Sequence, residues 1–206
     1  MISSQKFWDK MAPRYARSKI RDEAGYQKKL AKTQEYFRPD WRVLEFGCGT
    51  GTTALIHAPH VAHILATDVS GNMIEIARGK AQAAGIENVR FERGTLEELP
   101  LEPESFDAVL GLNILHLLED VDGTMERVHG LLKPGGIFVS STAVMADVPW
   151  YWRMLIPVAQ LVGLAPYLAK LSREDLVMKM THVGFTIDHE WKQGAMAVFL
   201  VVRKAG

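Results

Sequence analysis

The sequence contains almost no cysteine and has no excess of charge of either sign. Its single cysteine, Cys48, has no partner for an internal disulfide and cannot build a cysteine cluster, so we expect no metal site. Lys plus Arg and Asp plus Glu both number 24, which gives a formal net charge of zero. Proteins that bind duplex nucleic acid usually show a basic excess, so this balance argues against a nucleic-acid partner.

Long uninterrupted hydrophobic runs are absent as well. The most apolar segment, residues 148–171, is broken by Arg153 and by three prolines, whereas a membrane-spanning helix needs roughly 20 consecutive apolar residues. The first residues, MISSQKFWDK, lack the apolar core of a signal peptide. We therefore expect a cytoplasmic protein with no transmembrane span. For the apolar segment, a peripheral membrane contact and a homodimer interface both stay open.

What the sequence does contain is a regular alternation of strand-like and helix-like segments. The predicted strands cover residues 42–47, 63–68, 89–94, 106–113, 136–143, 185–193 and 195–204. The predicted helices cover residues 52–59, 70–85, 121–135 and 172–184. Residues 6–37 are polar and predict short helices that are punctuated by Pro13 and Gly25.

This alternation is typical of a mainly parallel sheet with helices on both faces. Gly194 and Ala195 leave only a hairpin-sized connection between the last two strands, which must then be antiparallel. The sequence therefore predicts an α/β fold in one domain, residues 1–206. Its sheet is doubly wound, Rossmann-like, seven-stranded and mostly parallel, with an antiparallel last strand.

A glycine-rich turn follows the first predicted strand, in the stretch VLEFGCGTG. Gly47, Gly49 and Gly51 either save space in a tight turn or leave the backbone open to a ligand at a helix start. Their spacing lacks the gap of the dinucleotide fingerprint, and no Lys-Ser/Thr follows as in a P-loop. Asp68 ends the second predicted strand, where a carboxylate can accept hydrogen bonds from both hydroxyls of a ribose. The carboxylate favours the ligand interpretation.

Four linked segments carry a family resemblance: VLEFGCGTG, ATDVSGNMIEIAR, FERGTLEELPLEPESFDAVLGLNILHLLED and VHGLLKPGGIFV. Together they resemble the class I S-adenosylmethionine-dependent methyltransferases, and within them the small-molecule branch that includes the ubiquinone/menaquinone C-methyltransferases. The resemblance runs from about residue 43 to residue 141. It implies S-adenosylmethionine as cofactor and S-adenosylhomocysteine as product.

The resemblance also implies roles for individual residues. The loop that cups the methionine part of the cofactor matches Glu45, Gly47, Cys48, Gly49 and Gly51, with Cys48 contributing its backbone. Positions near the nucleoside match Asp68 for the ribose, Val69 and Met73 for the adenosine, and Thr95 and Leu96 for the adenine. Family members often have a carboxylate where Thr95 stands, so the usual bond to the adenine amino group is in doubt.

Two further positions extend the expected site. Asn113 matches a position that faces the methionine end of the cofactor, and Tyr15 matches the tyrosine of an N-terminal helical flap, residues 1–40, that covers it. For Tyr15, simple packing of a helix onto the core is an equal alternative. His116 follows the fourth strand and is the best-placed candidate for a general base. A histidine that lines the pocket without transferring protons is the competing interpretation.

The acceptor is predicted from the apolar insert, residues 145–172. Trp150, Tyr151, Trp152, Met154 and Leu155 would form an aromatic lid over a small, hydrophobic or lipid-like acceptor. Ordinary packing or a dimer interface would explain the same residues. No Asn-Pro-Pro-aromatic motif follows the fourth strand, which argues against methylation of nucleic-acid bases. Two other functions remain: a non-catalytic S-adenosylmethionine sensor, and a nicotinamide-dependent reductase, against which the glycine spacing speaks.

Overall fold

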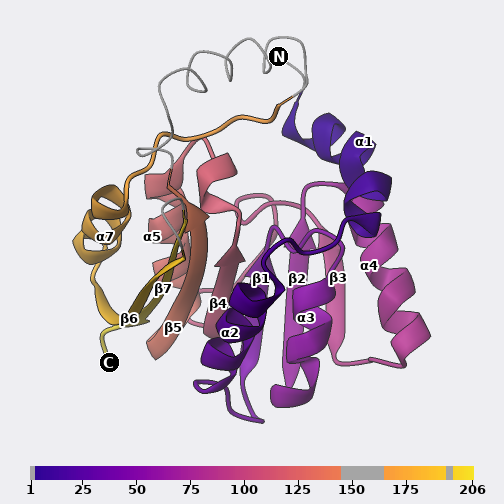
Figure 1. Cartoon of the computed structure of the whole chain (residues 1–206). Coiled ribbons are helices and arrows are strands. Elements are labelled where there is room, and N and C mark those ends of the chain that lie inside the picture. The colour runs from indigo at the N-terminus through magenta and orange to yellow at the C-terminus, as the bar shows by residue number, and fades with distance from the viewer. Residues whose placement is uncertain (1–2, 145–164, 194–196) are drawn as a thin grey trace.

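The computed structural model describes residues 3–144, 165–193 and 197–206 (Figure 1). At its centre lies one sheet with the strand order β3-β2-β1-β4-β5-β7-β6. The strands are β1 (Arg42–Phe46), β2 (His63–Asp68), β3 (Val89–Arg93), β4 (Phe106–Leu112), β5 (Leu132–Ala143), β6 (Phe185–Gln193) and β7 (Ala197–Lys204). Strands β1 to β5 pair in parallel, and β7 is antiparallel to both β5 and β6. This confirms the predicted doubly wound sheet with its reversed last strand.

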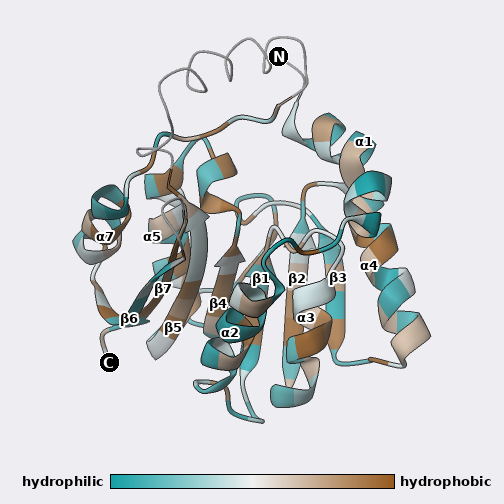
Figure 2. Ribbon diagram, in the orientation of Figure 1, coloured by the Kyte–Doolittle hydropathy of each residue, from teal (hydrophilic) through white to brown (hydrophobic). Residues whose placement is uncertain are grey.

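Helices cover both faces of the sheet. They are α1 (Ser4–Arg17), α2 (Glu23–Gln34), α3 (Thr52–His57), α4 (Gly71–Ala84), α5 (Val121–Leu131) and α7 (Arg173–His182), with short 3-10 turns η1 (Ala58–His60) and η2 (Leu115–Leu117). Alternate side chains of β1 enter two separate cores: Val43 packs with the α3 and α4 side, and Leu44 packs with the α5 and α7 side. Hydrophobic and hydrophilic positions alternate along these helices (Figure 2). No helix in the described ranges is long and apolar enough to cross a membrane.

The N-terminal helices differ from the prediction, because neither Pro13 nor Gly25 ends one. Pro13 lies inside α1, where it cannot donate the usual hydrogen bond to the Asp9 carbonyl. That carbonyl instead accepts a bond from Asn72 Nδ2 at 3.0 Å, which explains how the helix continues. Gly25 lies in the first turn of α2, and its N–H donates to Asp22 Oδ1 at 2.9 Å. Residues 18–22 are not helical and connect the two helices.

The boundary between α5 and β5 also differs. The predicted helix over residues 121–135 ends at Leu131, and β5 begins immediately at Leu132. Pro134 disfavours helical backbone at the residue before it, so the helix stops early. The Lys-Pro-Gly-Gly segment then falls at a register shift, because Leu132 pairs with Phe106 whereas Ile137 pairs with Ala108.

Candidate functional site

The glycine loop lies between the end of β1 and the start of α3, at the carboxyl edge of the sheet. Gly47, Gly49 and Gly51 all have positive φ angles, of 64°, 54° and 73°. A Cβ on Gly47 would lie 2.6 Å from Ile114 Cγ1, and one on Gly51 would lie 2.6 Å from Phe91 Cε1. A Cβ on Gly49 would approach only Tyr15 Cε1, at 3.6 Å, among the described residues. Close packing against Ile114 and Phe91 therefore leaves no room for a side chain at Gly47 and Gly51. At Gly49 a side chain would have room, so the backbone there is accessible from the side of Tyr15.

Asp68 lies at the end of β2 and is tied to this loop. Its Oδ2 accepts the Gly49 N–H at 2.8 Å, and its Oδ1 accepts the Ser70 N–H at 2.9 Å. Burial raises the pKa of Asp68, and these two backbone N–H groups oppose that rise. Each carboxylate oxygen can accept a second bond, so Asp68 shapes the loop and still has acceptor capacity for a ligand.

Helix α1 is anchored beside this carboxylate. Asp9 Oδ1 accepts a bond from Ser70 Oγ at 2.7 Å and another from the Asn72 N–H at 3.2 Å. Ser70 also caps α4, because its Oγ accepts the Met73 N–H at 3.2 Å. One serine thus connects α1, α4 and Asp68.

Glu45 is a buried carboxylate at the end of β1. The residue is 3% exposed, and within the described part of the chain its Oε2 has no hydrogen-bond partner. Burial, and then the nearby charge of Asp68, raise the pKa of Glu45 from 4.5 to about 8. An acceptor in this state is suited to a ligand that brings its own positive charge or N–H donors.

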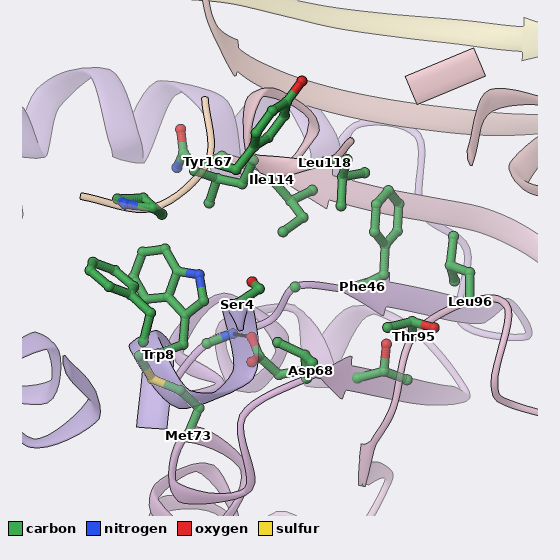
Figure 3. Close-up of a pocket in the computed structure, with 18 of the residues that line it drawn as sticks. Ser4, Trp8, Phe46, Asp68, Met73, Thr95, Leu96, Ile114, Leu118 and Tyr167 are labelled. Atoms are coloured by element: carbon green, nitrogen blue, oxygen red, sulfur yellow. Dashed lines mark hydrogen bonds between the residues drawn. The ribbon is translucent and has the colours of Figure 1, made fainter. Parts of the chain in front are cut away.

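Two cavities meet at the glycine loop. The first has a volume of about 460 Å³, and Figure 3 shows Asp68 and Met73 on one side of it, with Thr95 and Leu96 at one end. Of the predicted site residues it is lined by Tyr15, Gly47, Gly49, Asp68, Val69, Met73, Thr95, Leu96 and Asn113. The second has a volume of about 680 Å³ and is lined by Glu45 and Cys48 among others. Tyr15, Gly47, Gly49, Leu112 and Asn113 line both cavities.

Comparisons with known proteins address the family and the fold of the chain. Residues 43–136 match the family model described as "Methyltransferase domain". An "Uncharacterized methyltransferase YcgJ" of Bacillus subtilis is 36% identical over 138 residues, which cover 67% of this chain and 54% of the relative. The chain thus spans about half the length of that relative.

Residues 43–136 are thus similar to the methyltransferase domain family. This confirms the resemblance drawn from the linked sequence motifs. A demethylmenaquinone methyltransferase of Symbiobacterium thermophilum is 24% identical over 202 residues, covering 90% of this chain and 77% of that protein. The crystal structure of YcgJ from Bacillus subtilis superimposes with a TM-score of 0.74 at 20% identity, covering 87% of this chain and 99% of that one.

Two residues of the methyltransferase domain have unusual local geometry at the cavities. Asn113 adopts a left-handed backbone with a φ of 59°, and its N–H donates to the Ser141 carbonyl at 2.6 Å. Residues other than glycine adopt this conformation infrequently, asparagine more readily than most, and such positions cluster at functional sites. Thr95 forms a reciprocal pair with Glu98: Thr95 Oγ1 accepts the Glu98 N–H, and Glu98 Oε2 accepts the Thr95 N–H. The hydroxyl proton of Thr95 is left to donate.

His116 is not brought to either cavity. It lies in η2, whose neighbours Ile114, Leu117 and Leu118 line the first cavity, while His116 itself is not among the lining residues. Burial lowers the pKa of its ring to about 4, and its carbonyl accepts the Ala169 N–H at 2.8 Å. His116 is thus hydrogen-bonded through its carbonyl to Ala169 and lines neither cavity. Its role as a general base stays a prediction.

Sequence reasoning missed the aromatic wall that α1 provides. Phe7 and Trp8 line the first cavity together with Tyr15, and Trp8 contacts Tyr15 edge to face with ring centroids 6.4 Å apart. Their spacing of seven and eight residues from Tyr15 places all three on one face of a helix, which is the signal that could have found them. The lid residues Trp150, Tyr151, Trp152, Met154 and Leu155 lie outside the described residues.

Proposed function

We propose that this protein transfers a methyl group from S-adenosylmethionine to a small apolar acceptor. The observation that carries the proposal is the pair of buried carboxylates, Asp68 and Glu45, on two sides of a glycine backbone that stays open at Gly49. Asp68 has acceptor capacity for ribose hydroxyls, and the unpartnered Glu45 oxygen has it for an ammonium group. These are two polar groups that the cofactor would offer, so the residues fit it.

The assignment of the remaining residues follows the two cavities. Val69, Met73, Thr95 and Leu96 would surround the adenosine in the first cavity. The Thr95 hydroxyl can donate to a ring nitrogen of adenine, which replaces the bond that a carboxylate would accept from the amino group. Gly47, Cys48, Gly49 and Asn113 would border the methionine part, since they line the second cavity, and Tyr15 would cover the junction.

The acceptor would occupy the apolar end of the first cavity. Its walls beyond the nucleoside positions are Phe7, Trp8, Ile114, Leu117, Leu118 and Tyr167. Trp8 and Tyr167 come from opposite sides of this cavity (Figure 3). Residues 165–172 are the described part of the predicted lid, and three of them, Ala165, Pro166 and Tyr167, also line this cavity. A relative named as a demethylmenaquinone methyltransferase supports a small-molecule acceptor.

When bound, the cofactor supplies an electrophilic methyl group, which leaves the protein the tasks of alignment and exclusion of water. The aromatic residues of α1 and the apolar residues of η2 would hold an acceptor at the junction of the two cavities. Tyr15 and Asn113, which border both, would fix the line between acceptor and sulfur.

Calorimetry and a methyl-transfer assay test this function. We expect S-adenosylhomocysteine to bind and NADH not to bind, and Asp68→Asn to weaken that binding by about tenfold or more through loss of charged acceptors. Labelled methyl groups should then pass to apolar ring compounds and lipids. Binding without transfer to any acceptor would indicate the sensor function, and transfer to hydrophilic acceptors alone would contradict the apolar site.

A further inference from the structure

A third cavity lies away from the glycine loop and concentrates arginine side chains. This cavity, the basic groove, has a volume of about 710 Å³ and is lined by residues of β1, β2, β3 and α4 and of the segment that joins β3 to β4. No described residue lines both the basic groove and either of the other two cavities. Its charged and titratable lining residues are four arginines, one histidine and two glutamates: Arg42, Arg78, Arg90, Arg93, His63, Glu92 and Glu102. The formal net charge of zero therefore hides a local excess of positive charge.

The sheet brings three of these basic groups together. Arg42 is the register partner of His63 on the neighbouring strand. Arg90 is the partner of Leu65, which lies two residues beyond His63. Because side chains alternate along a strand, all three basic side chains lie on the face opposite α3 and α4. Like charges placed side by side in a sheet are destabilising, so an anion among these groups would stabilise the arrangement.

The positive charge of the basic groove is only partly neutralised. Arg90 forms an ion pair with Glu92. Arg42, which is exposed, forms no ion pair among the described residues. Burial lowers the pKa of His63, and the nearby charges of Arg42 and Arg90 lower it further. The arginine charges thus converge on His63, where they disfavour a proton and favour an anion.

The basic groove also has an apolar floor. Leu65, Leu99, Leu101 and Phe106 line it, and Arg42 Cζ lies 5.8 Å from the centroid of the Phe106 ring. A guanidinium group above a ring keeps its N–H edge free, and its paired N–H donors match two oxygens of a phosphate group. The combination suits a ligand that carries a phosphate group on a ring or another apolar body.

The concave shape favours a small molecule over a flat membrane surface. Ordinary small-molecule sites have volumes of about 300–1,000 Å³, and the basic groove falls within this range. Its arginines surround a hollow in which an apolar group has room, whereas a membrane surface would present only phosphate groups to a patch of this kind. The occupant is therefore assigned to a free phosphate ester.

The segment after β3 separates the basic groove from the first cavity. Thr95 and Leu96 line the first cavity, whereas Leu99 lines the basic groove. A Cβ on Gly94 would lie 2.9 Å from Leu99 Cγ, so this segment is closely packed on itself. A ligand in the basic groove would contact the segment that borders the first cavity without entering that cavity.

We propose that the basic groove binds a small organic phosphate, with Arg42 and Arg90 holding the phosphate group and Phe106 and its apolar neighbours contacting the rest. The site shares no described lining residue with the cavities at the glycine loop, so this inference does not rest on the proposed function. A bound phosphate would also offset the crowding of positive charge around His63.

Calorimetry with phenyl phosphate, which carries a phosphate group on an aromatic ring, tests the proposal. We expect phenyl phosphate to bind at a single site, inorganic phosphate to bind several-fold more weakly because it lacks the ring, and phenol to give no measurable binding. Combining Arg42→Gln with Arg90→Gln should weaken the binding of phenyl phosphate by about tenfold or more, and Arg42→Gln alone should cause part of this loss.

Arg38→Gln is the matched control. Arg38 is exposed, lies just before β1 and lines none of the three cavities, so its loss should leave the affinity for phenyl phosphate unchanged. Without ligand, the circular dichroism spectrum and thermal midpoint of the double variant should match those of the unmodified protein, which shows that a lost affinity is not lost folding.

Three outcomes would overturn the proposal. Equal affinity of phenyl phosphate for the double variant and the unmodified protein would place its binding elsewhere. Binding to phosphatidylglycerol vesicles without binding of phenyl phosphate would indicate a membrane-facing surface. The absence of binding to either would show that these arginines form only a solvated face of the sheet.

Discussion

The buried carboxylate of Glu45 leads to a quantitative prediction for Glu45→Gln. The pKa of Glu45 is about 8 in the folded protein and has an ordinary value of 4.5, so the folded state holds this proton more tightly than the unfolded chain does. The contribution of this bound proton to the free energy of unfolding is therefore complete below pH 4.5. It is lost progressively as the pH rises from 4.5 through 8, the pKa in the folded protein. At about 1.4 kcal/mol per pKa unit, the loss is on the order of 3 kcal/mol at pH 7 and 5 kcal/mol above pH 8.

Glutamine keeps the shape of the side chain and removes the ionisation. We expect the free energy of unfolding of Glu45→Gln to equal that of the unmodified protein at pH 4.5, and to exceed it by up to about 3 kcal/mol at pH 7. Urea unfolding followed by circular dichroism at several pH values between 4.5 and 8 measures this difference. Binding of S-adenosylhomocysteine should weaken in the same variant, because glutamine cannot release a proton to become a charged acceptor for the ammonium group.

A substitution on the surface provides the control. Glu75 is exposed on α4, so Glu75→Gln should leave both the pH profile and the affinity unchanged. A stability difference for Glu45→Gln that does not grow with pH would refute the reasoning about buried charge. Tighter binding in a more stable variant would refute the assignment of Glu45 to the ligand.

The remaining predictions separate packing from binding around the glycine loop. Gly51→Ala should lower the free energy of unfolding by roughly 2–4 kcal/mol in urea unfolding, because its Cβ would lie 2.6 Å from the Phe91 ring at a left-handed φ. Gly49→Ala should cost roughly 1–2 kcal/mol through its φ alone, but should weaken S-adenosylhomocysteine binding more than Gly51→Ala in calorimetry. Asp9→Asn should loosen α1, giving faster proteolysis between α1 and α2 and several-fold weaker binding, and an unchanged proteolysis rate would contradict the role of Asp9 as its anchor.

Periodicity and turn chemistry predict most of the sheet, because its strands are apolar and are bounded by glycine, proline and helix-capping residues. Ser70 and Gly85 delimit α4, with Ser70 as N-cap and Gly85 in a left-handed conformation at the C-cap, as local chemistry requires. Pro13 shows where this reasoning fails. Local sequence marks a helix end there, but the proline is accommodated by a bond from Asn72, which lies 59 residues further along the chain.

The residues of the candidate site also fall into two groups, those that the sequence predicts and those that only the folded structure identifies. Positions on the glycine loop and the strand ends could be named from the sequence, because the parallel sheet brings them to one edge. Asp9 could not, since its role depends on a contact with Ser70 that only the folded chain creates. His116 stands close to the site in sequence, yet the turn of η2 directs its neighbours into the cavity instead.

The position of β7 has a consequence for synthesis of the chain. This strand follows all the others in sequence but fills an interior place in the sheet, between β5 and β6, and residues 198–202 are at most 2% exposed. Until β7 emerges from the ribosome, the facing edges of β5 and β6 have no partner, and both hydrophobic cores lack side chains that complete them. Unpaired apolar edges are prone to aggregation, so a nascent chain that has released β6 but not β7 exposes two strand edges that the folded sheet covers.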